Sequence, residues 1–176
     1  MGKARRPVQI VILLGVLLLG GYAIGEALFA SDDKILKAGE RPPDFKLLDL
    51  NGEAKELQDF QKDGKALVIN FWGTFCPPCV KEMPEFQRQY EKWKDSLEIV
   101  AINLSEDDLT VRNFVSRFKL DFPVLRDSNR MVERRYGLRQ YPTTFFVKPD
   151  GRIMEIFVGG MTEKDIDKRI ERLLAS

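Results

Sequence analysis

Two apolar runs mark the centre of the predicted fold. Ala66–Phe71 and Glu98–Leu104 are rich in β-branched and aliphatic residues, which is typical of strands covered on both faces of a sheet. Between them, apolar side chains recur at the spacing of an amphipathic helix whose stripe faces the core: Met83, Phe86, Tyr90 and Trp93. A strand, a helix and a second strand in this order predict a β-α-β unit with parallel strands and a right-handed connection.

The pattern continues towards the C-terminus. A second amphipathic stretch leads to a third strand at Phe122–Leu125, and the strands Thr143–Val147 and Ile153–Val158 enclose a Pro149-Asp150-Gly151 turn that predicts an antiparallel hairpin. The helical stripes are Val111, Phe114, Val115 and Phe118 in one segment, and Ile166, Ile170, Leu173 and Leu174 in the closing one. We therefore expect a layered α/β domain with a mixed sheet flanked by helices.

A small hairpin opens this domain. Phe45–Leu50 and Lys55–Leu57 lie on either side of Asn51-Gly52, a dipeptide that favours a type I′ turn between two strands. We expect this hairpin to be a peripheral element of the fold.

The first residues differ in character from the rest of the chain. Lys3, Arg5 and Arg6 precede Pro7–Gly25, a run without any charged residue. At about 1.5 Å per residue, a helix of this length spans a hydrocarbon core of roughly 30 Å. The positive-inside rule then places the N-terminus in the cytoplasm and the residues from about Ser31 onward on the outer face.

This interpretation divides the chain into four parts. Residues 1–6 form a cytoplasmic basic tail, 7–29 a transmembrane anchor, 30–43 a tether and 44–176 the folded domain. The chain is then a single-pass protein of the cell membrane with its domain on the extracytoplasmic side. A cleaved signal peptide, with Ala27 near the cleavage site, is the alternative.

Composition narrows the range of partners. Beyond the anchor lie about 146 residues, enough for one domain. The N-terminal part takes three basic residues and one acidic residue from the chain's 28 and 27, which leaves a net charge of −1. A balance so close to neutral gives no reason to expect nucleic acid or another polyanion as a partner.

The chain's only two cysteines stand in Cys76-Pro77-Pro78-Cys79, between the first apolar run and the first amphipathic stretch. A thiol at the beginning of a helix meets unpaired backbone N–H groups and the positive end of the dipole, which favour thiolate. Prolines suit a first helical turn because their missing N–H is not needed there. Cys76 is therefore the candidate nucleophile, and Cys79, one turn later, can close a disulfide with it.

Two other interpretations of the cysteine pair are weaker. A structural zinc site needs four ligands, but the chain has no histidine and no third cysteine. A purely structural disulfide would close a very short loop and remove little entropy from the unfolded chain. We expect a redox-active dithiol that uses no metal and no cofactor.

These motifs resemble a known fold. Residues 71–79, Phe-Trp-Gly-Thr-Phe-Cys-Pro-Pro-Cys, with Tyr141-Pro142-Thr143-Thr144-Phe145 and the Gly151 hairpin, resemble the thioredoxin fold over roughly Pro43–Leu174. Within it, the chain most resembles the membrane-anchored TlpA/ResA-like thiol-disulfide oxidoreductases. The anchor, the opening hairpin and an inserted strand and helix around Glu98–Phe118 favour this branch.

The resemblance assigns roles to several residues. It makes Cys76 the attacking thiol, Cys79 the resolving thiol and Pro142 a cis proline beside the disulfide. Glu82, one turn after Cys79, resembles the active-site glutamate of the ResA-like branch and could move the proton of Cys79. The alternative for Glu82 is an exposed helix charge. Asn70 stands where many thioredoxins carry a buried acid, so a proton relay must come from elsewhere, which favours Glu82.

The substrate is expected to dock around the proline. In the related fold, the residue before the proline pairs its backbone with an extended substrate chain. We assign Pro142, Tyr141 and Trp72 to this docking site, although the two aromatic residues could equally belong to the core.

The resemblance also implies a function. Family members of this type keep extracytoplasmic disulfides reduced, and the ResA-like ones reduce the haem-binding cysteines of apocytochrome c before haem attachment. They receive electrons through a membrane thiol carrier of the CcdA type. By resemblance, this chain is a reductase of oxidised apocytochrome c or of other extracytoplasmic disulfide proteins.

Three alternatives stay open. The same chemistry run backward would make the chain a disulfide donor to secreted proteins. Phe75 stands where the family often has tryptophan, and Pro77 where ResA-like proteins have an acidic residue, which leaves the reduction potential open. A copper-binding assembly chaperone could use two thiolates, but related chaperones add a histidine. A peroxidase is the third alternative, since the opening hairpin also occurs in peroxiredoxin-like relatives.

Overall fold

The structure is a computed structural model that describes residues 14–16, 20–21 and 35–176. The chain divides into two units, Met1–Asp33 and Lys34–Ser176. Residues 14–16 and 20–21 are helical. The predicted basic tail at 1–6, most of the anchor at 7–29 and the start of the tether lie outside the described residues. Within the part of the chain that is described, no helix is both long and apolar enough to cross a membrane.

The second unit is built on one seven-stranded mixed sheet in the order β2-β1-β5-β4-β3-β6-β7. Strands β3, β4 and β5 are parallel to one another. Strand β1 pairs antiparallel with β5, and β6 pairs antiparallel with β3 and with β7. The strands are β1 (Lys46–Asp49), β2 (Ala54–Glu56), β3 (Ala66–Trp72), β4 (Leu97–Leu104), β5 (Val124–Asp127), β6 (Thr143–Val147) and β7 (Ile153–Val158).

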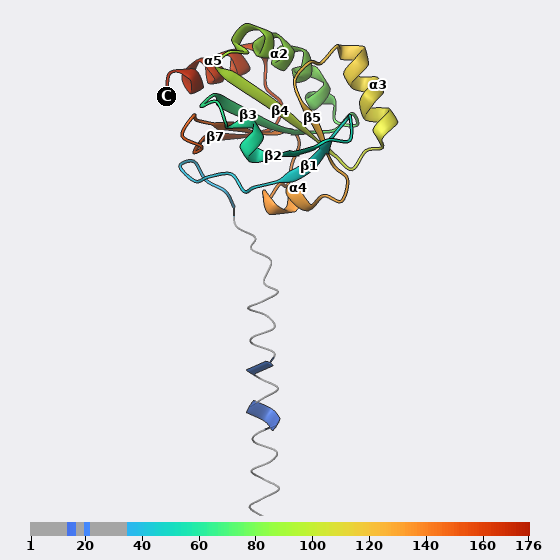
Figure 1. Cartoon of the computed structure of the whole chain (residues 1–176), viewed down its shortest axis with the longest axis vertical. Helices are drawn as coiled ribbons and strands as arrows, with labels where there is room; N and C mark the ends of the chain where they lie inside the picture. The colour runs from blue at the N-terminus through green and yellow to red at the C-terminus, as the bar shows by residue number, and fades with distance from the viewer. Residues whose placement is uncertain (1–13, 17–19, 22–34) are drawn as a thin grey trace, which may run out of the picture. The chain divides into compact units, whose positions relative to one another are not determined.

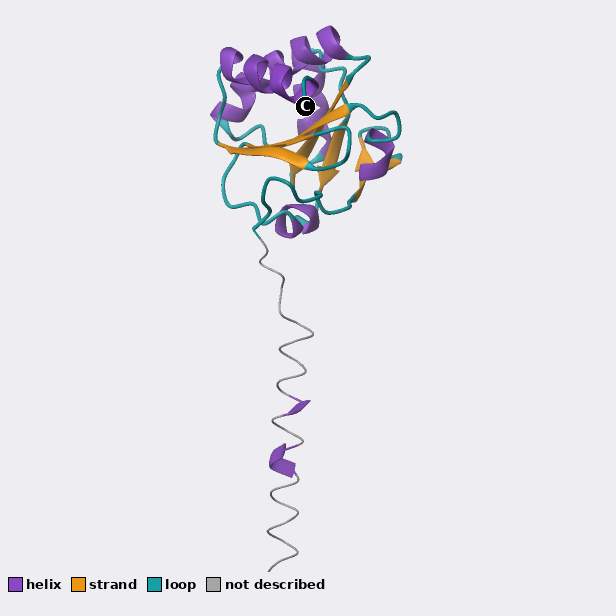
Figure 2. Ribbon diagram, turned by 90° about the vertical axis from the view of Figure 1, so that its left-hand side faces the viewer, coloured by secondary structure: helices purple, strands orange, loops and turns teal. Residues whose placement is uncertain are grey.

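Helices cover both faces of this sheet (Figures 1 and 2). One face carries the three longest helices of this unit, and the other carries α4, the 3-10 helix η1 and the segment around Leu36. The helices are η1 (Leu57–Phe60), α2 (Pro77–Trp93), α3 (Asp108–Phe118), α4 (Met131–Arg135) and α5 (Glu163–Leu174). Because α2 and α3 connect successive parallel strands in the same direction, right-handed connections place them on the same face.

Strand β3, an inner strand of the sheet, separates two cores. All seven of its residues are buried, and its side chains alternate between the faces: Val68 and Trp72 contribute to the core under α2, α3 and α5, and Leu67 and Ile69 to the opposite core. The carboxyl end of β3 leads directly into the loop that carries Cys76. A rigid strand buried on both faces therefore positions the start of α2.

The predicted α/β architecture with a mixed sheet is confirmed, and the two strands of the C-terminal hairpin have the predicted bounds. The prediction of a type I′ turn in the opening hairpin is wrong. Gly52 has a positive φ of 83° and donates its N–H to Asp49, while Asn51 has no positive φ, so the turn ends on a single left-handed residue. The hairpin also joins the main sheet through β5. Helix α4 and η1 were not predicted.

Candidate active site

The two cysteines form a disulfide at the start of α2. The S–S distance is 2.10 Å and the Cα atoms are 5.3 Å apart. Cys76 is the N-cap residue of α2, and its sulfur accepts a hydrogen bond from the backbone N–H of Cys79 at 3.4 Å. Cys76 is 7% exposed and Cys79 is fully buried. Only Cys76 therefore presents its sulfur to an incoming disulfide, and its place at the helix N-terminus favours the thiolate.

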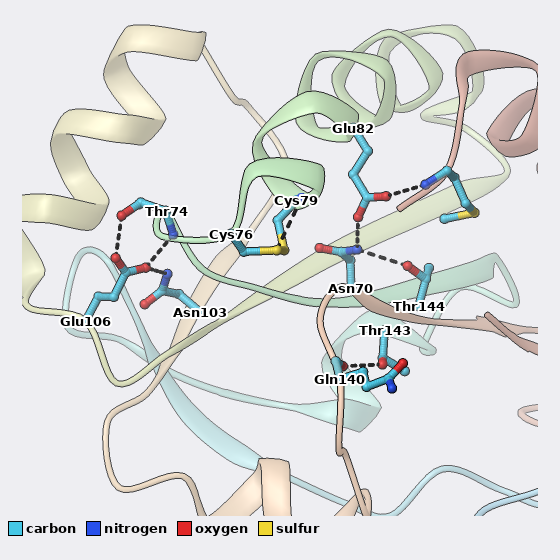
Figure 3. Close-up of a disulfide and its surroundings, with 11 residues drawn as sticks. Asn70, Thr74, Cys76, Cys79, Glu82, Asn103, Glu106, Gln140, Thr143 and Thr144 are labelled. Carbon is cyan, nitrogen blue, oxygen red and sulfur yellow. Dashed lines mark hydrogen bonds between the residues drawn. A yellow bond between two sulfur atoms is a disulfide. The ribbon is translucent and has the colours of Figure 1, made fainter. Parts of the chain in front are cut away.

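Glu82 lies one turn further along α2 and points into the protein (Figure 3). Its residue is 1% exposed. One carboxyl oxygen accepts a hydrogen bond from Asn70 Nδ2 at 2.8 Å, and the other accepts one from the backbone N–H of Met161 at 3.2 Å. Burial raises the pKa of Glu82 to about 7, against the opposing effect of these two hydrogen bonds. The alternative of an exposed helix charge is therefore wrong.

A carboxyl group that titrates near neutral pH can both accept and return a proton at working pH. Glu82 and Cys79 are separated by one helical turn and both lie on the buried side of α2. The arrangement is compatible with the role of proton acceptor for the resolving thiol, which the resemblance implies for Glu82 and which stays a prediction.

Asn70 connects Glu82 to the sheet. It lies on β3, is fully buried, and its Nδ2 donates to Thr144 Oγ1 at 3.0 Å as well as to Glu82. Thr144 is the register partner of Asn70 on β6. Asn70 therefore links the Glu82 carboxyl on α2 to strand β6.

A second glutamate holds the loop between β3 and Cys76. Glu106 accepts hydrogen bonds from the backbone N–H of Thr74 at 2.7 Å, from Asn103 Nδ2 at 2.6 Å and from the Thr74 hydroxyl (Figure 3). Asn103 lies on β4 and is fully buried. Glu106 therefore ties the loop to the neighbouring strand. Sequence reasoning missed Glu106 and Thr144, and no local motif marks either residue.

Pro142 lies at the same end of the sheet as the disulfide, because Thr143 begins β6 and pairs with Phe71 near the end of β3. The Tyr141–Pro142 bond is cis, as expected. The Tyr141 hydroxyl donates to Glu133 and accepts from Arg130 Nη2 at 3.0 Å. Tyr141 as a whole is half-buried, so the residues of α4 hold its hydroxyl group while part of the residue stays accessible.

The assignment of Trp72 to substrate docking is wrong. Its side chain is fully buried and packs against Phe114 with the ring centroids 4.7 Å apart. Trp72 faces the core because it shares the orientation of Val68 on β3, four residues earlier. Phe75 is instead the exposed aromatic residue beside Cys76, with 60% of its surface accessible. Its ring lies over Gly73, where a Cβ would be 2.3 Å from the Phe75 ring.

The described residues hold no group of three or more His, Cys, Asp or Glu side chains that could bind a metal ion.

Known proteins are similar to this chain over most of its length. The family model described as the AhpC/TSA family matches residues 38–156. The thiol-disulfide oxidoreductase ResA of Halalkalibacterium halodurans is 39% identical over 173 residues, which cover 97% of each chain. The chain belongs to the ResA-like thiol-disulfide oxidoreductases. The ResA protein of Bacillus subtilis is also 39% identical, over 93% of this chain and 90% of its own length.

Solved structures agree on the fold. A putative thiol:disulfide interchange protein DsbE from Chlorobium tepidum superposes with a TM-score of 0.72 at 27% identity, over 79% of this chain and 99% of that one. StoA from Bacillus subtilis matches with a TM-score of 0.61 at 29% identity, over 73% and 97%. This ResA-like chain is a thiol-disulfide oxidoreductase with a thioredoxin-like fold.

Proposed function

We propose that this ResA-like protein is a reductase anchored in the cell membrane by residues 7–29, and that it reduces the haem-binding cysteines of oxidised apocytochrome c on the extracytoplasmic side. Its electrons would come from a membrane thiol carrier of the CcdA type. The observation that carries the reductive direction is the buried Glu82 carboxyl behind Cys79. A carboxylate there disfavours a second thiolate, which makes the reduced dithiol less stable and therefore a stronger reductant.

The order of the reaction steps follows from the accessibility of the two cysteines, since Cys76 is slightly exposed and Cys79 is fully buried. The Cys76 thiolate attacks one sulfur of the substrate disulfide, and the other substrate sulfur leaves as a thiolate that takes up a proton. Cys79 then gives its proton to Glu82 and attacks Cys76, which breaks the mixed disulfide and releases the second substrate sulfur as a thiolate that takes up a proton from the solvent. Two electrons pass from the dithiol to the substrate, and the protein is left with the Cys76–Cys79 disulfide.

Accessibility supports a substrate with an exposed, extended cysteine segment. Cys76 is only 7% exposed and lies between the exposed residues Phe75, Pro77 and Pro78. A disulfide within a folded protein could not reach this sulfur easily. The Cys-x-x-Cys-His segment of an unfolded apocytochrome meets the requirement.

The first experiment measures the reduction potential of the Cys76/Cys79 couple in dithiothreitol buffers. A value near or below that of thioredoxin, about −270 mV, supports a reductant. A value near that of DsbA, about −120 mV, would make the protein a disulfide donor.

The second experiment compares two oxidised peptides, one with Cys-x-x-Cys-His and one with the histidine moved away from the cysteines. We expect the reduced protein to act faster on the first. Equal rates would contradict apocytochrome c as the preferred substrate without contradicting the reductive direction. Cys79→Ala should retain the first peptide on Cys76 as a mixed disulfide, detected by mass.

The location has its own test. If residues 7–29 anchor the chain with its domain outside, protease added to intact protoplasts digests the domain of the full-length protein. Protection in intact protoplasts, with digestion after lysis, would contradict the proposed orientation.

A further inference from the structure

The side-chain amide of Asn70 makes hydrogen bonds through its nitrogen atom. Its nitrogen donates to Glu82 Oε1 at 2.8 Å and to Thr144 Oγ1 at 3.0 Å, whereas its oxygen, Oδ1, is buried and has no hydrogen-bond partner among the residues that the structure describes. A buried carbonyl oxygen that accepts no hydrogen bond lowers the stability of the folded protein, and such oxygens are rare in native structures.

The two donor contacts fix the orientation of the amide. When Glu82 is ionised, its carboxylate only accepts hydrogen bonds, so the nitrogen of Asn70 faces Glu82. The oxygen is then directed to the other side, and Figure 3 shows it pointing toward the Cys76–Cys79 disulfide. The unpaired acceptor is thus aimed at the redox centre.

The disulfide has no proton to offer this oxygen, but the reduced protein does. Reduction converts the sulfur of Cys79, which is fully buried, into an S–H group. A buried thiol is a donor that needs an acceptor, and a buried amide oxygen is an acceptor that needs a donor. Each group supplies what the other lacks.

We infer that Asn70 is a positioning residue of the reaction: in the reduced protein its oxygen accepts the S–H of Cys79 while its nitrogen donates to Glu82. One planar amide then spans the two groups between which the proton moves when Cys79 attacks the mixed disulfide. It holds the thiol and the carboxylate in register and is not itself changed. This role concerns the dithiol chemistry and does not depend on apocytochrome c being the substrate.

A hydrogen bond made only in the reduced state stabilises that state. Replacing Asn70 by leucine removes the bond and also removes the unpaired oxygen from the oxidised state. Both effects favour the disulfide, so we expect the equilibrium constant for reduction by dithiothreitol to fall by about fivefold. The matched control is Asn103→Leu, because Asn103 is also buried, also bonds a glutamate and also has an unpaired Oδ1, which points away from the disulfide in Figure 3.

The expected result is a shift in Asn70→Leu and a change below about twofold in Asn103→Leu. No shift in the Asn70 variant, or an equal shift in both, would overturn the inference. Since Asn70→Leu could fail to fold, a second measurement leaves Asn70 in place. The side-chain carbonyl 13C signal of Asn70 is compared in oxidised and reduced wild type and in Cys79→Ser and Cys79→Ala, with Cys76 kept reduced.

A serine at position 79 keeps a donor and an alanine removes it. We therefore expect the Asn70 carbonyl signal in Cys79→Ser to move in the same direction as in reduced wild type. In Cys79→Ala it should stay near its position in the oxidised protein. Identical signals in the serine and alanine variants would show that position 79 gives no hydrogen bond to Asn70.

Discussion

Two asparagine–glutamate pairs flank the disulfide and differ in what their carboxyl groups can do. Asn70 and Asn103 lie on the adjacent strands β3 and β4, both fully buried, and each donates its Nδ2 to a glutamate, at 2.8 Å to Glu82 and at 2.6 Å to Glu106. The two pairs consist of the same residue types joined by the same kind of hydrogen bond. Their glutamates, however, sit in different surroundings.

Glu82 is 1% exposed and, within the described part of the chain, accepts hydrogen bonds only from Asn70 and the Met161 backbone. Its pKa is raised to about 7 by burial. Glu106 is half-buried and accepts three hydrogen bonds, two of them from Thr74 in the active-site loop. Burial with few donors produces a group that exchanges a proton. Partial exposure with many donors produces an anchor for a loop.

The largest expected effect is on the rate of disulfide reduction, which should fall far more when Glu82 is replaced than when Glu106 is replaced. Glu82→Gln keeps the size of the side chain but leaves a single acceptor oxygen and cannot take up a proton, so we expect a loss of about 10²-fold or more in the reduction of a model disulfide at pH 7. Glu106→Gln should cost less than about tenfold because an amide oxygen still accepts from Thr74. Steady-state assays with insulin or oxidised glutathione measure both, and similar losses would contradict the division of roles.

The second prediction concerns stability and pH. The carboxyl of Glu82 titrates at its ordinary pKa near 4.5 in the unfolded chain and at about 7 in the folded protein. Between these values the folded state binds more protons, so the free energy of unfolding falls as pH rises and levels off above about 7. The loss is on the order of 2–3 kcal/mol.

Urea unfolding of the oxidised protein at pH 5 and pH 8 measures this loss. Glu82→Gln should remove most of the difference, whereas Glu106→Gln should retain it. If the wild-type protein had the same free energy of unfolding at pH 5 and at pH 8, the pKa of Glu82 would not be raised.

The third prediction concerns the loop. Glu106→Ala leaves the Thr74 N–H without its acceptor, and we expect a loss of about 1–2 kcal/mol in stability. The Thr74 amide should exchange its hydrogen faster by at least about tenfold, while the backbone amides of β3 keep their protection. Amide exchange followed by NMR tests this, with Glu82→Gln as the control that leaves Thr74 protected. Unchanged exchange at Thr74 would mean that Glu106 does not hold the loop.

The smallest effect is expected at Gly160. A Cβ there would lie 2.6 Å from the Cβ of Pro78, so Gly160→Ala pushes its segment away from α2, and the adjacent Met161 N–H away from Glu82. We expect a loss of about 1 kcal/mol and a further rise in the pKa of Glu82, because a hydrogen bond that lowers it is weakened. Gly159→Ala is not a suitable control, since Gly159 has a positive φ of 105°.

Gly39→Ala is no better as a control for the same reason, its φ being 90°. The control is therefore Pro78→Gly combined with Gly160→Ala, which removes the Cβ atom that the new methyl group would meet. A pKa of Glu82 that rises in the single variant and returns in the double variant supports the contact. No change in the single variant would count against it.

Several features of the protein were predictable from local sequence. Strand and helix periodicities located β3, β4, α2 and the C-terminal hairpin, and Cys76-Pro77-Pro78-Cys79 predicted a helix with a thiol at its tip. Glu82 was recognised as the candidate proton acceptor through resemblance. These features depend on neighbours within a turn or a strand, so a linear pattern is enough to predict them.

The burial of Glu82 could not be predicted from the linear sequence pattern. Helix α2 also buries Glu85, Gln87 and Gln89, so its polar residues do not mark a solvent face and sequence spacing cannot tell which carboxyl group is desolvated. The short helix α4, Met131–Arg135, is too brief and too polar to show a period. Trp72 looked like a docking residue because its distance from Cys76 along the chain is short, but the pleat of β3 turns it into the core.

The amino-acid sequence by itself determined the order of strands and helices, the redox pair and the residues available to serve it. Only the tertiary structure decided which of those residues act together. The contact between Asn70 and Thr144 spans 74 positions and that between Glu82 and Met161 spans 79. Periodicity, caps and turns are short-range, whereas the desolvation that raises the pKa of Glu82 exists only after distant segments have packed around it.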